Sequence, residues 1–174
     1  VTLAIGVSRM ANRHAIIRSL PAVETLGSTT IIGSDKTGTL TKNQMTVQQI
    51  WADGQLFSTT KTGYQLEGSI TRDGPVKVGK ESGLYRTVLA GTLANEANVT
   101  GLESGEPQGD PTEIALHVSA YKAGIQLSDV QLSFQEADIL PFEPETQFMA
   151  TLNRRNDEQF VFLKGAPEVV IEKC

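Results

Sequence analysis

The chain has 174 residues, of which 39% are hydrophobic and 20% are charged, with a formal net charge of −5 and a pI near 5.1. This balance is typical of one folded domain, or of a small domain plus part of another, and it excludes a disordered chain. The acidic charge argues against a nucleic-acid-binding surface, and the single cysteine, Cys174, excludes an internal disulfide.

The first 27 residues are predicted to be helical. Val1–Leu20 is expected to form one amphipathic helix that ends near Pro21, and Ala22–Gly27 is expected to form a short helical turn. The apolar start Val1–Val7 is much shorter than the roughly 20 apolar residues that cross a bilayer.

A β-branched apolar run is followed directly by a carboxylate. The run predicts a buried parallel strand at Thr29–Ser34, and Asp35 would then lie at the strand end where open α/β sheets bind ligands. Lys36 and Thr37 add a positive charge and a hydroxyl, and Gly38 lets the backbone fold around an anion. The pattern favours a carboxylate that attacks a phosphoryl group. The alternative is that Asp35 only caps a helix or turn.

From about Thr46 onward, alternating strands and helices replace the buried-strand pattern. Asp53-Gly54 predicts a hairpin turn, and Ser82 and Asp110 predict helix starts. The expected strands are Thr46–Trp51, Leu56–Thr60, Tyr64–Ile70, Val130–Phe134, Ile139–Phe142, Phe148–Asn153 and Gln159–Lys164. The expected helices are Ser82–Ala97, Pro111–Ala123 and one that begins at Pro167. These elements predict a mixed, mainly antiparallel α+β domain.

Three later segments carry candidate ligand-binding residues. Glu113 lies one turn into the helix that Asp110 caps, so its carboxylate serves either a ligand or the free N–H groups of the helix. Phe142 lies between two prolines and either presents its ring to a cleft or packs in the core. Lys164 and Gly165 join a strand to a helix, where the lysine either meets a ligand or is an ordinary surface residue.

These strings resemble one protein family. Asp35–Thr41 (DKTGTLT) resembles the phosphorylation signature of the P-type ATPases, cation pumps that form an aspartyl phosphate. The strings GDPTEIAL, ILPF and KGAPE resemble, in the same order, segments of the family's nucleotide-binding domain, and the likeness is strongest to the calcium-type branch. A haloacid-dehalogenase-type phosphatase is disfavoured, because such enzymes usually carry a second Asp where this chain has Thr37.

The resemblance implies a role for each matching residue of the phosphorylation string. Asp35 would be the nucleophile, and Lys36 would add a neighbouring positive charge. Mg²⁺ would bridge the Asp35 carboxylate and the phosphate, with a further contact from the main-chain carbonyl of Thr37.

The resemblance also implies an ATP site made of later residues. Glu113, Phe142 and Lys164 would hold the adenine, and Gly165 would let the backbone approach the ligand. The chain departs from the family at Gln147, where many relatives carry a lysine that meets the nucleotide. The amide of Gln147 can still hydrogen-bond to the nucleotide, but a neutral group cannot offset phosphate charge, so weaker binding is expected.

In this interpretation the fold class is α/β, with three regions. Residues 1–27 form a stalk helix and linker, residues 28–46 begin a haloacid-dehalogenase-like phosphorylation domain, and residues 47–174 form most of a nucleotide-binding domain that is cut short at its end.

The expected location is the cytoplasmic face of a membrane. The expected partners are ATP, the transported cation and the rest of the pump with its transmembrane helices, and not nucleic acid. Because the family's later signatures are missing, the chain alone is expected to be inactive. The alternative is a nucleotide-binding module without catalysis.

Overall fold

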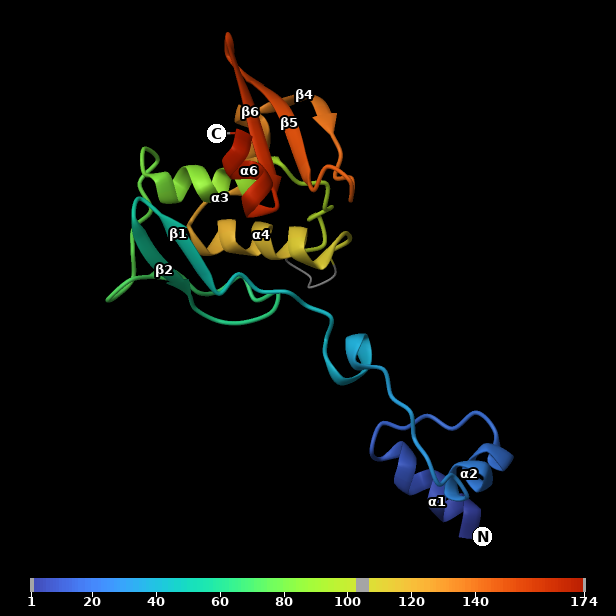
Figure 1. Cartoon of the computed structure of the whole chain (residues 1–174). Coiled ribbons are helices and arrows are strands. Elements are labelled where there is room, and N and C mark those ends of the chain that lie inside the picture. Colours follow the sequence, from blue (N-terminus) through green and yellow to red (C-terminus); the bar gives the residue numbers. More distant parts are fainter. Residues whose placement is uncertain (1, 103–106, 174) are drawn as a thin grey trace. The chain divides into compact units, whose positions relative to one another are not determined.

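The computed structural model describes residues 2–102 and 107–173. The chain divides into two compact units, Val1–Lys42 and Asn43–Cys174. Figure 1 shows the helices and strands of each unit.

The described part of the first unit contains two short α-helices, α1 (Thr2–Ala11) and α2 (Leu20–Gly27), and the one-turn helix Lys36–Leu40. The prediction of a single helix through Leu20 is wrong. The chain turns at His14, whose φ of 61° is left-handed and cannot continue an α-helix. Pro21 lies in the first turn of α2, where its missing N–H costs nothing, so it begins a helix instead of ending one.

The predicted strand Thr29–Ser34 is absent. The segment has no regular secondary structure and lies in solvent, with 84% of the Ile31 side chain exposed. A parallel strand needs neighbouring strands to satisfy its N–H and C=O groups, and the described part of the first unit contains no strand. Residues 2–42 therefore show no start of a haloacid-dehalogenase-like sheet. Among the helices of the described ranges, none combines the length and apolar character needed to cross a membrane.

The described residues of the second unit form two three-stranded antiparallel sheets and four helices, in agreement with the predicted mixed α+β domain. The first sheet contains β1 (Gln49–Ala52), β2 (Gln55–Thr59) and β3 (Ile70–Thr71). The second contains β4 (Gln135–Leu140), β5 (Phe148–Arg155) and β6 (Glu158–Gly165). The helices are α3 (Gly83–Leu93), α4 (Pro111–Lys122), α5 (Leu127–Ser133) and α6 (Pro167–Lys173).

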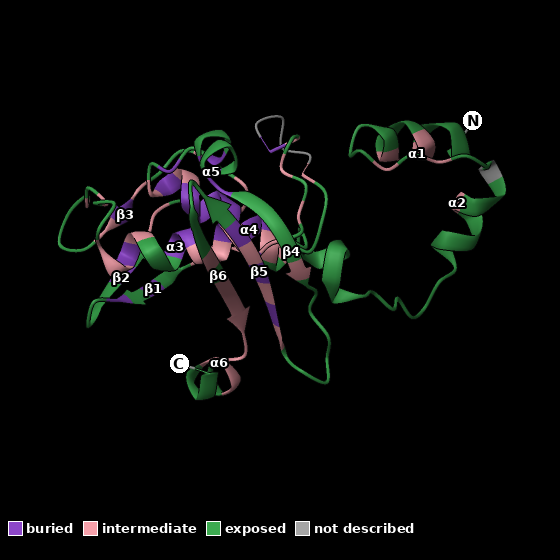
Figure 2. Ribbon diagram, turned by 90° about the horizontal axis from the view of Figure 1, so that it is seen from above, coloured by how far each residue is buried: buried purple, intermediate pink, exposed green. Residues whose placement is uncertain are grey.

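The core of this unit lies where α3 packs against α4, β1 and β6. Ile70 and Leu84 are almost completely buried and join the first sheet to α3. A second apolar cluster is built on Ile114 and Val118, which lie on α4, and on Leu102. Figure 2 shows the buried residues concentrated in this unit, whereas α1 and α2 are mostly exposed.

The hairpin turn between β1 and β2 confirms the prediction from Asp53-Gly54. Both residues have positive φ, 52° and 70°, as a two-residue hairpin turn requires. The Asp53 carboxylate also accepts hydrogen bonds from the N–H groups of Gly83 (2.7 Å) and Leu84 (3.3 Å), while the Ser82 hydroxyl accepts from Tyr85 (3.1 Å). The first turn of α3 is therefore held by its own cap and by the hairpin.

The predicted strand Val130–Phe134 is wrong, because residues 130–133 belong to α5 and Phe134 is the C-cap of that helix. Val130 and Phe134 are both buried and lie four positions apart, whereas Leu132 between them is 83% exposed. That spacing places Val130 and Phe134 on one face of a helix. A short apolar run is compatible both with the helical repeat of about 3.6 residues and with the two-residue repeat of a strand, so it does not by itself distinguish a helix from a strand.

Other predicted elements differ in length. The predicted strand Tyr64–Ile70 shrinks to β3, because Tyr64 packs on the second apolar cluster instead. The predicted strand Ile139–Phe142 is shifted to β4 and ends before Pro141, which has no N–H to donate to a sheet. The helix predicted at Ser82–Ala97 ends earlier, at Leu93.

Candidate functional site

A pocket of about 520 Å³ lies at the N-terminal end of α4. It contains four of the five residues that the sequence assigned to nucleotide binding, although they are far apart in the chain. The residues lining it are Glu96, Asp110, Thr112, Glu113, Phe142, Met149, Lys164 and Gly165. Glu96, Asp110, Thr112 and Met149 were not predicted as site residues. Asp110 and Thr112 belong to the string GDPTEIAL, which also contains Glu113, so the sequence offered a signal for both. No sequence pattern indicates a site role for Glu96 or Met149.

An ion pair joins two of the charged residues that line the pocket. Lys164 Nζ, from β6, donates to Glu113 Oε1, from the first turn of α4, at 2.7 Å. The side chains are 24% and 15% exposed, so the pair is shielded from water yet open to a ligand. Glu113 Oε2 accepts a hydrogen bond from the Glu96 N–H at 3.3 Å. Both carboxylate oxygens are thus fixed before any ligand arrives.

Asp110 caps α4, as predicted. Its carboxylate accepts from the Thr112 N–H at 2.8 Å, and Pro111 follows in the first turn. Burial by itself would raise the pKa of Asp110, but hydrogen bonds from Thr112 and Glu113 and the positive charge of Lys164 outweigh it and lower that pKa. Asp110 is therefore a carboxylate at neutral pH and adds negative charge to the pocket.

Phe142 lies in the loop after β4 and lines the pocket. The alternative that Phe142 packs in the core is wrong, because its side chain is 52% exposed. Met149 is completely buried and also lines the pocket, and in the sheet it pairs with Lys164. The pocket therefore combines an apolar wall with an accessible aromatic ring.

Gln147 does not line this pocket. It adopts a φ of 58° in the turn before β5, and its side chain is exposed. Its carbonyl accepts a hydrogen bond from the Ala166 N–H at 2.9 Å. A Cβ on Gly165 would lie 2.5 Å from that same Gln147 oxygen and 2.5 Å from Phe148 Cβ. The structure therefore explains Gly165 by the close approach of this turn to the end of β6.

His117 follows Glu113 by one turn of α4 and was not predicted as a site residue. Its side chain is 6% exposed, and Nδ1 has no hydrogen-bond partner within the described structure. Burial lowers the pKa of His117 to about 4; the Glu113 carboxylate opposes this shift and the Lys164 ammonium adds to it. The imidazole is therefore neutral at physiological pH.

Asp35 lies in the first unit, in an exposed turn. Its Oδ1 accepts a hydrogen bond from the Lys36 N–H at 2.7 Å, so Asp35 caps the one-turn helix Lys36–Leu40, as the alternative interpretation held. Two residues inside this turn are not helical: Thr37 has an extended backbone, and Gly38 adopts a φ of 74°. The described residues contain no group of three or more His, Cys, Asp or Glu side chains placed to hold a metal ion.

Comparison with known proteins assigns the chain to a family. Residues 83–174, slightly more than half of the chain, match the family described as "P-type ATPase, cytoplasmic domain N". The chain belongs to the P-type ATPases. The matched range contains Glu113, Phe142 and Lys164, so this assignment does not depend on the conformation of Asp35.

Curated relatives agree with the family assignment, and with the resemblance seen in the sequence. The chain is 46% identical over its whole length to "Probable cation-transporting ATPase F" of Mycobacterium tuberculosis, and 37% identical over 99% of its length to "Calcium-transporting ATPase" of Bacillus subtilis. It is 40% identical over its whole length to "Calcium-transporting ATPase type 2C member 1" of Pongo abelii. In each case the chain covers only 19% or 20% of the relative. It thus spans about a fifth of these cation-transporting P-type ATPases.

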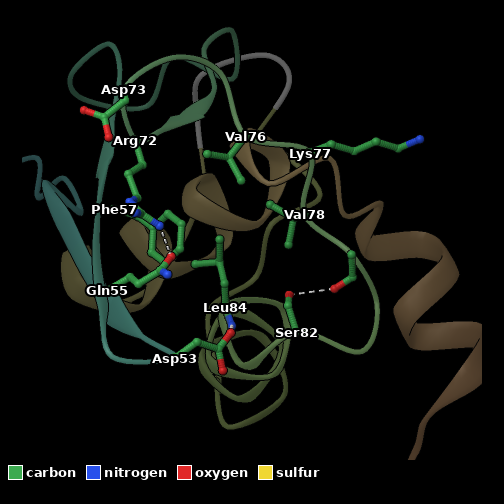
Figure 3. Close-up of a pocket in the computed structure, with 11 residues that line it drawn as sticks. Asp53, Gln55, Phe57, Arg72, Asp73, Val76, Lys77, Val78, Ser82 and Leu84 are labelled. Carbon is green, nitrogen blue, oxygen red and sulfur yellow. Dashed lines mark hydrogen bonds between the residues drawn. The ribbon is translucent and has the colours of Figure 1, made fainter.

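This P-type ATPase chain has a second pocket, of about 450 Å³, between the first sheet and the start of α3 (Figure 3). Its charged groups are already engaged or turned away. The Asp53 carboxylate caps α3, Arg72 donates to Gln55, and Lys77 extends away from the pocket. Phe57 and Leu84 form its apolar floor as part of the core. Nothing in this arrangement marks a polar ligand, in contrast to the paired charges at the N-terminal end of α4.

Proposed function

We propose that the pocket at the N-terminal end of α4 binds the adenine of ATP. The chain would then be the ATP-binding part of a cation-transporting P-type ATPase. The observation that supports the proposal is the convergence of Glu113, Phe142 and Lys164, from three separate segments, on one pocket. Its volume of about 520 Å³ falls within the range of roughly 300–1,000 Å³ of small-molecule sites.

The lining residues match the chemistry of a purine ring. The half-exposed Phe142 ring offers a stacking surface, which is worth about 1–3 kcal/mol for a base on an aromatic side chain. Glu113 can accept a hydrogen bond from the exocyclic amino group, and Lys164 can donate one to a ring nitrogen. Because these two groups already hold each other at 2.7 Å, little ordering is needed when the base binds.

The charge of the pocket favours the base over the phosphates. Three carboxylate side chains line it, those of Glu96, Asp110 and Glu113, against the single ammonium of Lys164. This excess of negative charge repels a triphosphate but not a neutral adenine. The phosphates therefore extend away from the pocket, which is the orientation a pump needs to transfer the terminal group elsewhere.

Asp35 is the proposed acceptor of that terminal phosphoryl group. In the intact pump, an Asp35 carboxylate oxygen attacks the γ-phosphorus, the bond from that phosphorus to the bridging oxygen breaks, and ADP leaves. Lys36 supplies adjacent positive charge, and the left-handed Gly38 shapes the turn. This role also implies that residues 28–46 begin a haloacid-dehalogenase-like phosphorylation domain whose sheet is built by other parts of the pump.

Magnesium use is expected from the family, but the described residues alone do not make a magnesium site. They hold no cluster of metal-binding side chains, and Asp35 with the Thr37 carbonyl supplies only part of the octahedral oxygen shell that Mg²⁺ requires. No step is therefore assigned to the metal in this chain.

The remaining proposals concern the whole pump. The transported ion is a cation, and several relatives are named as calcium transporters. The partners are ATP and the other segments of the pump, including its transmembrane helices, at the cytoplasmic face of a membrane. Residues 1–27, with α1 and α2, would form the stalk and linker that connect to those transmembrane helices.

A second candidate function is a nucleotide-binding module with no turnover of its own. The exposed position of Asp35 and the lack of a metal-ligand cluster in the described ranges favour this behaviour for the chain on its own.

Calorimetric titration with ATP tests the binding proposal. Lys164→Ala is expected to weaken binding of ATP at least about tenfold, equivalent to roughly 1.4 kcal/mol, because it removes a donor and leaves Glu113 unpaired. Lys77→Ala is the matched control, since this exposed lysine lines the other pocket, and it should bind like the wild type. Asp35→Asn should also keep wild-type affinity.

Three outcomes would contradict these proposals. Absence of ATP binding by the wild type, or equal losses in Lys164→Ala and Lys77→Ala, would remove the assignment of the pocket. Robust ATP hydrolysis by the purified chain that Asp35→Asn abolishes would rule out the second candidate function, a nucleotide-binding module with no turnover of its own.

A further inference from the structure

The segment that follows α3 contacts Glu113 from two successive residues. Asn95 Nδ2 donates to the carbonyl of Glu113 at 3.0 Å and to the carbonyl of Gly91 at 3.0 Å, while Asn95 Oδ1 accepts from the Ala97 N–H at 2.9 Å. The next N–H along the chain, that of Glu96, donates to Glu113 Oε2 at 3.3 Å. One short segment thus holds both the backbone and the carboxylate of Glu113.

The end of α3 is itself fixed to the opposite side of the pocket. The Thr151 hydroxyl, on β5 and almost completely buried, donates to the carbonyl of Leu93 at 3.1 Å. β5 also carries Met149, which lines the pocket and pairs with Lys164 of β6. The end of α3 is therefore tied both to β5, the sheet neighbour of the strand that carries Lys164, and to the helix that carries Glu113.

We infer that Asn95 is a positioning residue that holds the Glu113 carboxylate in register with Lys164. The inference rests on the proposed nucleotide site, because its consequence for binding requires that Glu113 meets the ligand. Asn95 makes three hydrogen bonds through one planar amide, joining α3, its own loop and α4. No other residue type reproduces two donated bonds and one accepted bond with this geometry. Without it, only the longer bond from Glu96 holds Glu113 from this side.

The first measurement is ATP affinity in a double-mutant cycle. Asn95→Ala is expected to weaken ATP binding about tenfold, and Asn95→Asp, which keeps the accepted bond but loses both donated ones, should weaken it at least as much. In a Glu113→Ala background the same Asn95→Ala change should have almost no further effect, because no carboxylate is left to position. Thr92→Val is the matched control, since it removes a buried side-chain bond within α3, to the Val88 carbonyl, but does not touch Glu113. It should lower Tm and leave the affinity unchanged.

The second measurement needs no nucleotide. In NMR spectra of the free chain, the side-chain signals of Lys164 report its contact with Glu113. Asn95→Ala should shift these signals in the same direction as Glu113→Ala, whereas Thr92→Val should leave them in place. Two results would overturn the positioning role even if the wild type binds ATP. One is that Asn95→Ala leaves the Lys164 signals unchanged. The other is that Asn95→Ala still weakens ATP binding tenfold in the Glu113→Ala background. Shifted signals in a chain that does not bind ATP would uphold the positioning role and reject the proposed function.

Discussion

Acidification from pH 6.5 to about pH 4 is expected to remove about 3 kcal/mol from the free energy of unfolding through His117 alone. Burial lowers the pKa of His117 from 6.5 to about 4, and a pKa difference of one between the folded and unfolded chain corresponds to about 1.4 kcal/mol. The folded state thus holds the imidazole neutral, whereas the unfolded chain binds a proton more readily. The stabilisation is present above pH 6.5, declines as the pH falls, and is lost below about pH 4.

The variant His117→Leu tests this expectation. Leucine fills a similar volume, has no proton to gain and removes the buried Nδ1 that has no partner in the described structure, so stability at pH 7 should change little. At pH 4.5 the variant should be clearly more stable than the wild type in urea denaturation. Carboxylates such as Asp110, whose lowered pKa also makes stability fall in acid, titrate equally in both proteins.

The other histidine provides the control. His14 is exposed and has a φ of 61°, which asparagine tolerates, and His14→Asn leaves His117 in place, so this variant should keep the acid sensitivity of the wild type. If wild type and His117→Leu lose stability in parallel between pH 6.5 and 4, the buried imidazole does not control the acid sensitivity.

Gly165→Ala is expected to destabilise the second unit by about 1–3 kcal/mol and to weaken ATP binding at least tenfold. The new Cβ would lie 2.5 Å from the Gln147 carbonyl oxygen and 2.7 Å from Phe148 Cα, both of which are backbone atoms. The turn before β5 must then move away from β6, and the hydrogen bond from Ala166 to Gln147 is broken or lengthened. Because Gly165 and Phe142 line the same pocket, that movement also changes the adenine site.

Urea denaturation and ATP titration of the same variant measure both effects. Gly79→Ala is the control, because no atom lies within 4 Å of its added Cβ and its φ is not in the left-handed region. This control should match the wild type within about 0.5 kcal/mol and bind ATP equally well. If Gly165→Ala has the stability and the ATP affinity of the wild type, a glycine at position 165 is not required by the close approach of Gln147 and Phe148.

The predictions based on local sequence patterns were the most reliable ones. Ser82 and Asp110 were predicted to begin helices, and each accepts a hydrogen bond from its first turn. Asp53-Gly54 was predicted to turn a hairpin, and both residues have the required positive φ. Each of these features depends on a few neighbouring residues, so the chain specifies it without knowledge of the rest of the fold.

Predictions that depended on distant partners were less successful. Thr29–Ser34 has the composition of a buried strand, but no neighbouring strand in the described first unit satisfies its backbone. Val130–Phe134 has the apolar content of a strand, but its buried residues lie four positions apart because α5 packs its Val130 and Phe134 face into the core. A short apolar segment does not reveal which surface it will cover.

The sequence alone determined the family, the helix caps and turns, and the candidate residues Glu113, Phe142 and Lys164, because these are recorded in short strings of neighbouring residues. Only the tertiary structure decided that those three lie around one pocket, that Gly165 serves a close backbone approach, and that Gln147 lies outside. It alone revealed Asn95 and His117, whose surroundings come from other elements. Hydrogen bonds and burial depend on which segments meet in space, and spacing along the chain does not encode that.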